Sequence, residues 1–257
     1  MTQLKNKTVF VTGASSGFGK EIAAAFAKKG SRLIIAARRA QRIKETAAEL
    51  KKSYGIEVLA MTLDVRKKSD VAKAVKSLPV KWRDIDILVN NAGLSRGLDK
   101  LQEGSIQDWD EMIDTNVKGL LYVTRSVLPN MVKRNSSHII NIGSIAGHEV
   151  YPKGNVYCAT KHAVAAINQG MRMDLNGTGI RVGAIHPGMV ETEFSEVRFK
   201  GDSERASQVY KGFKPLQPED IADIIHFVIS RPYHVNIADL VVMSVDQASS
   251  TIVNKNL

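Results

Sequence analysis

The chain alternates regularly between short apolar runs of strand length and longer amphipathic segments of helical period. The strand-like runs lie at 8–12, 32–37, 56–63, 85–89, 138–143, 180–185 and 237–245. The helix-like segments lie at 21–29, 40–53, 69–78, 109–133, 154–175 and 218–229. Strands that alternate with helices form a parallel sheet whose two faces are both covered. The pattern therefore predicts the α/β class, as one Rossmann-like, doubly wound domain with a parallel sheet of seven strands.

No linker, internal repeat or low-complexity segment interrupts this alternation, so we assign residues 1–257 to a single domain. Within it we expect a nucleotide-binding part at about 8–150 and a catalytic and substrate-binding part at about 138–257. The stretch 191–213 is polar and predicts irregular structure, and we expect a lid at about 188–214. Ligands of parallel α/β sheets bind beyond the carboxyl ends of the strands. The candidate residues below lie at those ends or on the helices that follow.

The charge of the chain is basic and uneven. Residues 1–85 carry 19 Lys and Arg against 7 Asp and Glu, or +12, and the remainder carries 17 against 19, or −2, which together give +10. A basic half attracts either nucleic acid or an anionic nucleotide cofactor. No nucleic-acid-binding motif accompanies the charge, so we expect no nucleic-acid partner. Cys158 is the single cysteine, which indicates a reducing compartment. No apolar run approaches the length of a membrane span, and we expect a cytoplasmic protein without a membrane partner.

A glycine-rich turn joins the first predicted strand to the first predicted helix. It reads Gly13-Ala14-Ser15-Ser16-Gly17-Phe18-Gly19, with the spacing G-x-x-x-G-x-G. Glycines let backbone N–H groups approach a phosphate, and the helix N-terminus stabilises the negative charge. The spacing differs from G-x-G-x-x-G, and it is not a P-loop because Glu21 follows Lys20 where a Ser or Thr binds magnesium. We interpret the turn as the phosphate cradle of a dinucleotide.

Two arginines, Arg38 and Arg39, close the second predicted strand. At this position a carboxylate binds the ribose 2′-OH of NAD, whereas arginine accommodates the 2′-phosphate of NADP. Because no acidic residue is present there, we predict NADP as the cofactor. We expect Arg38 to be the main contact to the 2′-phosphate, with Ser15 and Arg39 as helpers. The structural alternative is a solvated basic end of a helix.

Tyr157 and Lys161 are four residues apart in a predicted helix, so their side chains share one face. A cation close to a phenol favours the phenolate and lowers the pKa of the phenol, which suits general acid–base catalysis. Ser144 follows the strand-like run 138–143 and brings a hydroxyl to the edge of the sheet. We predict that these three residues act together. The alternative is a surface Tyr and Lys near a loop Ser.

Two further kinds of polar residue need an interpretation. Asn116 lies inside the predicted helix 109–133, where an amide competes for backbone hydrogen bonds, so it is either a helix-packing amide or a functional residue. Four histidines form no ligand-like cluster, and we expect them to be structural or solvent-facing, with no metal site. They are His138, His148, His162 and His186.

In order and spacing, these elements resemble the short-chain dehydrogenase/reductase family over essentially the whole chain. The motifs that carry the resemblance are T-G-A-S-S-G-F-G at 12–19, Asp64, N-N-A-G at 90–93, Asn116, Ser144, Y-x-x-x-K at 157–161 and Pro187-Gly188. The resemblance implies an oxidoreductase with a catalytic group of Asn116, Ser144, Tyr157 and Lys161. The cofactor contacts that we expect are Gly13, Ser15, Ser16, Gly17, Phe18, Gly19, Arg38, Arg39, Asp64, Val65, Asn91, Ala92, Gly93, Tyr157, Lys161, Pro187, Gly188, Val190 and Thr192.

The resemblance also implies a role for each catalytic residue and an assembly. Tyr157 exchanges a proton with the substrate oxygen, and Lys161 lowers the pKa of Tyr157 and holds the nicotinamide ribose. Ser144 orients the substrate oxygen, and Asn116 anchors a water that leads protons to Lys161. Hydride passes between the nicotinamide and the substrate carbon. A homotetramer is implied, with the helices near 109–133 and 154–175 at one interface and the last strand with its neighbouring helix at the other.

Within the family, the chain looks similar to the NADP-dependent 3-hydroxy acid dehydrogenases that act on serine, L-allo-threonine and related short acids. The stretches 187–195 and 197–202 carry this likeness, and 154–157 and 113–116 support it.

A small acid substrate requires a cation for its carboxylate, and we predict that Arg198, in the expected lid, supplies it. Arg96 and Lys153 are less favoured candidates, and a solvent-exposed lid arginine is the structural alternative. Two other functions stay open. One is an NADPH-dependent carbonyl or 3-oxoacyl reductase, and the other is a non-catalytic NADP-binding sensor.

Overall fold

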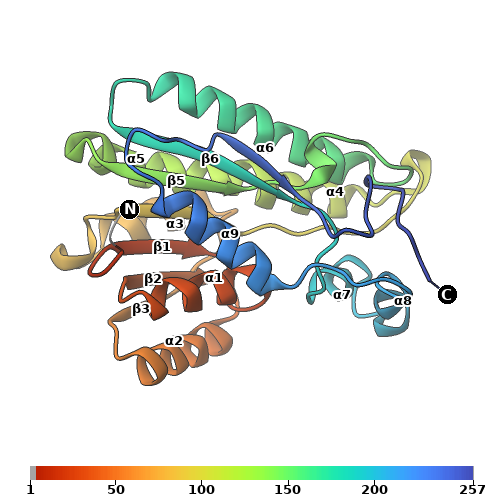
Figure 1. Cartoon of the computed structure of the whole chain (residues 1–257), viewed down its shortest axis with the longest axis horizontal. Helices are drawn as coiled ribbons and strands as arrows, with labels where there is room; N and C mark the ends of the chain where they lie inside the picture. Colours follow the sequence, from red (N-terminus) through yellow and green to blue (C-terminus); the bar gives the residue numbers. More distant parts are fainter. Residues whose placement is uncertain (1–3, 257) are drawn as a thin grey trace.

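A computed structural model describes residues 4–256 and contains one parallel sheet (Figure 1). Its strands are β1 (Thr8–Thr12), β2 (Arg32–Ala37), β3 (Val58–Thr62), β4 (Ile87–Asn90), β5 (Ser137–Ile142), β6 (Ile180–Pro187) and β7 (Asp239–Val242). They lie in the order β3-β2-β1-β4-β5-β6-β7, and each neighbouring pair is parallel. The predicted single α/β domain with a parallel sheet of seven strands is confirmed. The chain runs from β1 outward through β2 to the edge strand β3 and then returns to the other side of β1 to form β4. The topological switch point therefore lies between β1 and β4.

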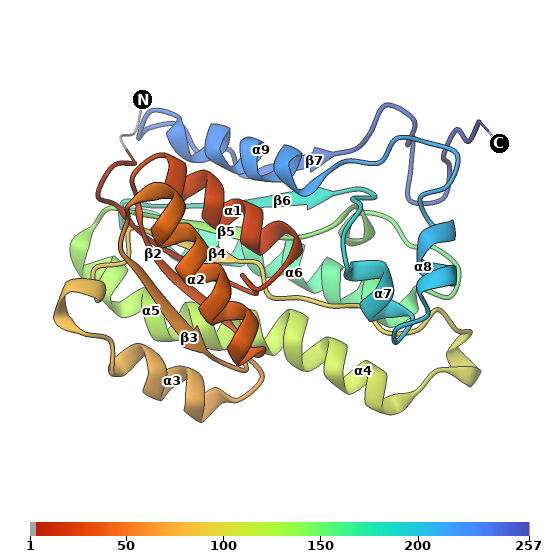
Figure 2. The ribbon, with the colours of Figure 1, turned by 90° about the horizontal axis from the view of Figure 1, so that it is seen from below.

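Helices cover both faces of the sheet (Figure 2). They are α1 (Gly17–Lys28), α2 (Ala40–Tyr54), α3 (Lys68–Lys76), α4 (Ile106–Ile113), α5 (Leu120–Arg134), α6 (Asn155–Asp174), α7 (Phe194–Arg198), α8 (Ser203–Gln208) and α9 (Pro218–Ser230). Short 3₁₀ turns lie at η1 (Val80–Trp82), η2 (Leu101–Glu103) and η4 (Ile145–Gly147). Helices α1, α2 and α9 pack on one face of the sheet, and α3, α5 and the end of α6 pack on the other.

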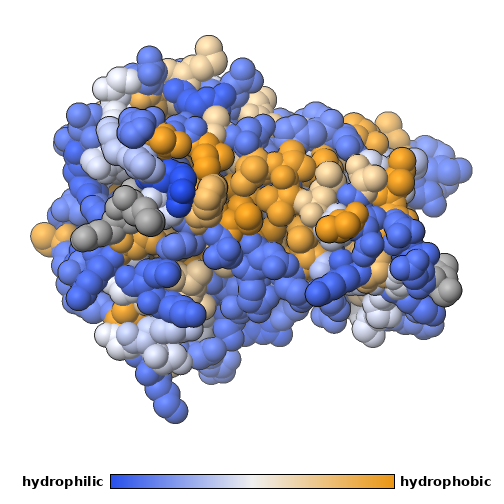
Figure 3. Space-filling model, in the orientation of Figure 1, coloured by the Kyte–Doolittle hydropathy of each residue, from blue (hydrophilic) through white to orange (hydrophobic). Residues whose placement is uncertain are grey.

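The surface carries exposed apolar side chains on several helices and on the last strand. In the view of Figure 3, a band of apolar side chains crosses the face on which β6 and β7 lie. Val241 of β7 and Phe227 of α9 are among the exposed large apolar residues. None of the helices formed by residues 4–256 combines the length and the apolarity that a membrane crossing needs.

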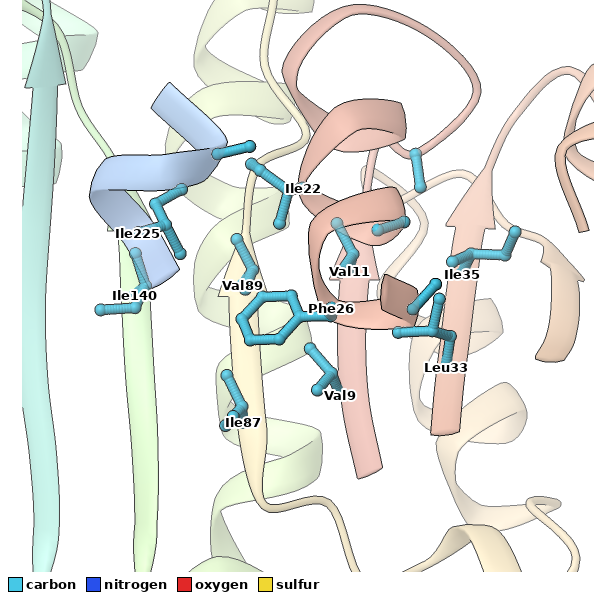
Figure 4. Close-up of a cluster of buried hydrophobic side chains, with 14 of the residues drawn as sticks. Val9, Val11, Ile22, Phe26, Leu33, Ile35, Ile87, Val89, Ile140 and Ile225 are labelled. Carbon is cyan, nitrogen blue, oxygen red and sulfur yellow. The ribbon is translucent and has the colours of Figure 1, made fainter. Parts of the chain in front are cut away.

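Each face of the sheet has its own apolar core, because successive strand residues point to opposite faces. On β1, Val9 and Val11 face the core beneath α1, whereas Phe10 faces the core beneath α3 and α5. In Figure 4, Phe26 and Ile22 of α1 lie over β1 and β4. Each of these side chains is 2% exposed or less, and burying one contributes roughly 1.5–3 kcal/mol. The cores therefore fix the strand ends on which the site is built.

The helical segment predicted over 109–133 is present, but it is not α-helical throughout. Between α4 and α5 the chain forms a π-helical turn, η3 (Asp114–Gly119), which contains Asn116. Two residues of this wider turn make close contacts with neighbouring segments. The Asn116 amide reaches the backbone of Leu94, and a Cβ added to Gly119 would lie 2.6 Å from Val65 Cγ2.

The expectation of irregular structure over 191–213 is also wrong. Helices α7 and α8 form there, and the Asp202 side chain caps α8 by accepting a hydrogen bond from the Arg205 amide. The final strand is shorter than the predicted 237–245, and β6 runs on to Pro187.

Candidate active site

A cavity of about 520 Å³ opens at the carboxyl ends of the central strands. The predicted site residues that line it are Gly13, Ser16, Gly17, Phe18, Asn91, Gly93, Ser144, Tyr157, Lys161, Pro187, Gly188, Val190, Thr192 and Arg198. The predicted residues outside this lining are Ser15, Gly19, Arg38, Arg39, Asp64, Val65, Ala92 and Asn116. Residues far apart in the sequence thus meet at the edge of the sheet that the alternation of strands and helices predicts.

The glycine turn has the backbone shape that a phosphate cradle needs. Gly13 and Gly17 have φ angles of +68° and +50°, in the left-handed region that favours glycine. A Cβ added to Gly19 would lie 2.4 Å from the Gly13 carbonyl oxygen and 2.5 Å from Asn91 Nδ2. Asn91 Nδ2 itself donates to the carbonyl oxygens of Thr12 and Gly13, at 2.8 and 3.2 Å. The turn is therefore held tightly against the loop after β4, with α1 beginning at Gly17.

The two arginines after β2 have different partners. Arg39 donates to the hydroxyls of Ser15, at 3.1 Å, and Ser16, at 2.6 Å, and pairs with Glu193 at 3.0 Å. Arg38 instead pairs with Glu111 at 3.0 Å. Arg39, and not the favoured Arg38, thus lies beside the serines of the turn. Which arginine binds a 2′-phosphate stays a prediction.

The sequence interpretation missed the carboxylates that these arginines contact. Glu111 of α4 pairs with Arg38, with Arg66 and with Arg96, at 3.0, 3.2 and 2.7 Å. Burial raises the pKa of Glu111, but hydrogen bonds from Arg96 and Arg38 outweigh it and leave this pKa below its ordinary value. Arg66 also pairs with Asp64, one of the predicted cofactor contacts, at 2.6 Å. No spacing in the sequence signals these pairs, because they join separate elements.

Tyr157 lies at the floor of the cavity and is 8% exposed. Burial raises the pKa of its phenol, and Tyr151 raises it further, whereas the Arg198 charge and a hydrogen bond with Ser144 lower it. The net shift is upward. Burial is the largest cause of this shift, and the cation that lowers the pKa here is Arg198. The lowering of the Tyr157 pKa by Lys161 stays a prediction.

Lys161 is buried and points its ammonium group past the phenol. Its Nζ donates to the Ile142 carbonyl oxygen at 2.9 Å and lies 5.9 Å from the centroid of the Tyr157 ring. Burial lowers the pKa of Lys161 to about 8. The ammonium group is thus close to its titration range near neutral pH, a property suited to proton exchange.

Ser144 lies two residues beyond the end of β5 and caps the N-terminus of η4. Its Oγ accepts from the Ala146 amide at 3.2 Å and lies 3.5 Å from the Pro187 carbonyl oxygen. The backbone extends straight from the buried strand, so the hydroxyl reaches the cavity beside Tyr157.

Asn116 is 2% exposed and joins three elements. Its Oδ1 accepts from the Leu94 amide and its Nδ2 donates to the Leu94 carbonyl, both at 2.8 Å, while Nδ2 also donates to Thr160 Oγ1 at 3.0 Å. The side chain therefore clamps the loop after β4 to α6, next to Lys161. Its predicted role in anchoring a water stays a prediction.

Arg198 enters the cavity from α7. It donates to the Tyr151 hydroxyl at 2.9 Å and to Ser95 Oγ at 3.1 Å, and its guanidinium lies 5.2 Å from the centroid of the Tyr157 ring. The two less favoured cations lie outside the cavity lining: Arg96 pairs with Glu111, and Lys153 belongs to a neighbouring turn.

The expectation that the histidines form no ligand-like cluster is wrong. His148, His186 and Asp239 bring their ligand atoms within 4.8 Å of one another. The parallel pairing of β6 with β7 places Asp239 next to the end of β6, and the turn after β5 supplies His148. Their wide separation in the sequence concealed the cluster.

Comparison with known proteins agrees with this architecture. A family model described as short chain dehydrogenase matches residues 7–203. The chain is 49% identical to NADP-dependent 3-hydroxy acid dehydrogenase YdfG of Salmonella typhi, over 93% of this chain and 96% of that protein. It is 45% identical to NADP-dependent 3-hydroxy acid dehydrogenase of Schizosaccharomyces pombe, over 97% of each.

A solved structure gives the same result. The closed form of serine dehydrogenase complexed with NADP⁺ matches 95% of this chain and 98% of that chain, at 46% identity and a TM-score of 0.91. The resemblance that the motifs suggested is confirmed, and the chain belongs to the short-chain dehydrogenase/reductase family.

Proposed function

We propose that the chain is an NADP-dependent dehydrogenase of short 3-hydroxy acids or β-hydroxy amino acids, of the serine or allo-threonine type. The observation that carries the substrate class is the guanidinium of Arg198, which lies inside the cavity 5.2 Å from the Tyr157 ring. A planar guanidinium binds a carboxylate with two parallel hydrogen bonds. A short acid bound there brings its hydroxyl carbon near the phenol. The names of the relatives at 49% and 45% identity support the same class.

The residues of the cradle fit NADP. Gly13 and Gly17 open the turn to a pyrophosphate at the start of α1, and two arginines are available for a 2′-phosphate. We assign this phosphate to Arg38 and Arg39, with the Ser15 hydroxyl between the turn and Arg39. When bound, NADP supplies the hydride acceptor or donor.

The protein residues then supply proton transfer and orientation. The Ser144 hydroxyl lowers the pKa of the Tyr157 phenol, and both groups line the same cavity, so both can address one substrate oxygen. In the oxidative direction, Tyr157 takes the hydroxyl proton while Arg198 stabilises the phenolate charge before that transfer. Lys161, with a pKa near 8, passes the proton onward, and Asn116 keeps the loop beside it in place.

An NADPH-dependent carbonyl or 3-oxoacyl reductase is the second candidate. The observation that favours it is the apolar remainder of the cavity, which includes Leu98, Ile145, Phe194, Phe199 and Val209. Such walls accept an uncharged ketone or an acyl chain without a cation. This function predicts that Arg198 is not needed to bind the substrate.

A substrate panel tests the proposal. We expect reduction of NADP⁺, and far slower reduction of NAD⁺, with L-serine, D-serine, L-allo-threonine, D-threonine, 3-hydroxypropionate or 3-hydroxyisobutyrate. Arg198→Ala should lower kcat/KM for the best acid by at least about tenfold, because loss of one charged hydrogen bond costs about 1.5–3 kcal/mol. Arg205→Ala removes an arginine of α8 that stacks on Phe199 and serves as the control. Turnover of neutral ketones or oxoacyl thioesters alone, unaffected by Arg198→Ala, contradicts the proposal.

We also propose a cytoplasmic homotetramer. Large apolar side chains are exposed on both pairs of elements that the family resemblance places at interfaces: Ile113, Leu121, Met173, Phe227 and Val241. Light scattering after size-exclusion chromatography should give four times the 28.2 kDa chain mass. Val241→Asp should reduce that mass, because a charge at an apolar interface opposes association.

A further inference from the structure

Two histidines and an aspartate gather behind the catalytic serine, outside the cavity lining. His186 Nε2 lies 2.5 Å from Asp239 Oδ1, and His148 Nε2 lies 3.9 Å from Asp239 Oδ2. The two imidazole rings meet edge to face with centroids 4.2 Å apart. His186 is fully buried, whereas the side chains of His148 and Asp239 are 33% and 50% exposed. The cluster therefore has one rigid member and two that can adjust and reach solvent.

The hydrogen bond of His186 Nδ1 determines whether Nε2 carries a hydrogen or a lone pair. Nδ1 lies 3.2 Å from the Ser144 carbonyl oxygen, which can only accept, so Nδ1 carries the hydrogen. In the neutral ring, Nε2 then presents a lone pair to the Asp239 carboxylate. Although the two atoms are close, His186 Nε2 has no aligned hydrogen-bond partner among residues 4–256. A buried lone pair that faces a carboxylate is unfavourable unless a positive charge lies between them.

We propose that His148, His186 and Asp239 form a binding site for a divalent transition-metal ion of the Zn²⁺ type. Two imidazoles and one carboxylate are a ligand set that zinc accepts. The bond from His186 Nδ1 to the Ser144 carbonyl is the outer contact that orients a metal-binding histidine. A cation between the ligands also removes the repulsion at His186 Nε2.

The distances require only small movements. Ligand bonds of about 2.0–2.2 Å in a tetrahedral site put ligand atoms about 3.4 Å apart. The 2.5 Å contact of Asp239 Oδ1 and the 3.9 Å contact of Asp239 Oδ2 lie on either side of that value, and all three ligand atoms lie within 4.8 Å of one another. The half-exposed carboxylate of Asp239 can shift to even them out, and the exposed side of the cluster leaves the fourth position to water.

The position of the site indicates a structural role. Its ligands come from the turn that begins at Ser144, from the end of β6 and from the first residue of β7. A bound ion ties these three segments together directly behind the Ser144 carbonyl, while none of its ligands lines the cavity. It is independent of the proposed substrate.

Metal titration of the chelator-treated full chain tests the proposal. Isothermal calorimetry should give one Zn²⁺ per chain, with no comparable binding of Mg²⁺, and Zn²⁺ should raise the thermal midpoint. Co²⁺ in the same site should give the visible absorption of a four-coordinate complex. His148→Ala and Asp239→Asn change the two exposed ligands, so the fold should persist, and each should weaken Zn²⁺ binding by at least about tenfold. His234→Ala, an exposed histidine outside the cluster, should leave the affinity unchanged.

Equal Zn²⁺ affinity in wild type, His148→Ala and Asp239→Asn overturns the proposal, as does the absence of stoichiometric binding. In either case the positive charge that lies between His186 Nε2 and the Asp239 carboxylate is a proton on the imidazole, and not a metal ion. Persistence of the Co²⁺ spectrum in Asp239→Asn overturns the assignment of this carboxylate as a ligand.

Discussion

The guanidinium of Arg198 lies 5.2 Å from the centroid of the Tyr157 ring, and its charge lowers the pKa of a phenol that burial raises. Arg198 is on α7, and its own carbonyl accepts a hydrogen bond from the Gly97 amide at 3.0 Å. A residue far outside the Y-x-x-x-K motif therefore adjusts the group that we assign to proton transfer. Arg198 has two proposed roles, since the same guanidinium can bind a substrate carboxylate.

An uncharged substrate separates these two roles. A secondary alcohol has no carboxylate, so any effect of Arg198→Met on its oxidation by NADP⁺ cannot come from lost carboxylate binding. We expect the ascending limb of the kcat/KM–pH profile to move to higher pH by about one unit, because the phenolate loses a stabilising cation and the pKa of Tyr157 rises. Arg205→Met should leave the limb in place. A limb that does not move with Arg198→Met would show that the charge does not reach Tyr157.

Lys161 makes the stability of the fold depend on pH. Its pKa of about 8 in the folded chain lies below the ordinary 10.5, so between these values the unfolded chain binds more protons and stability rises with pH. Relative to Lys161→Met, the free energy of unfolding of the wild type should rise by up to about 3 kcal/mol over this window. Tyr157 is common to both proteins and cancels in the difference. Urea unfolding from pH 7.5 to 10 measures it, and parallel curves contradict the assignment.

The sequence predicts the parallel sheet and the three catalytic candidates in the cavity because both depend on patterns between residues close together in the chain. Each strand end is marked by the residues that follow it, and parallel topology brings these ends together without knowledge of any contact. Ser144, Tyr157 and Lys161 could be proposed for this reason, and the structure brings all three to one cavity.

What the sequence could not predict depends on partners from distant elements. Glu111 and Glu193 form ion pairs with Arg38 and Arg39 only because α4 and the start of α7 pack next to the segment that follows β2. The pKa of Tyr157 is dominated by burial, which no i, i+4 spacing reveals. The histidine cluster requires the neighbouring register of β6 and β7.

Gly19 has no room for a side chain. A Cβ at this position would lie 2.4 Å from the Gly13 carbonyl oxygen, a backbone atom that cannot turn aside. Gly19→Ala should lower the free energy of unfolding by about 2 kcal/mol and weaken NADP⁺ binding by at least about tenfold, because the turn must shift. Lys20→Ala is the matched control: it removes only an exposed ion pair with Glu49, worth about 1 kcal/mol or less. Denaturant unfolding and NADP⁺ titration report both effects, and equal results for the two variants contradict the prediction.

Glu193 competes with the 2′-phosphate for the same cations. Its carboxylate pairs with Arg39 and Arg42 at 3.0 and 2.9 Å, and although burial raises its pKa, these arginines leave the net pKa below its ordinary value, so it is ionised at neutral pH. Glu193→Gln should tighten NADP⁺ binding about twofold to fivefold, since an exposed pair contributes about 0.2–1 kcal/mol. NAD⁺ lacks the 2′-phosphate, so its Kd should not change. Glu196→Gln removes the same charge from α7 on its exposed side and should alter neither Kd. If Glu193→Gln changes both Kd values by one factor, the site that Arg39 and Glu193 share is not the 2′-phosphate site.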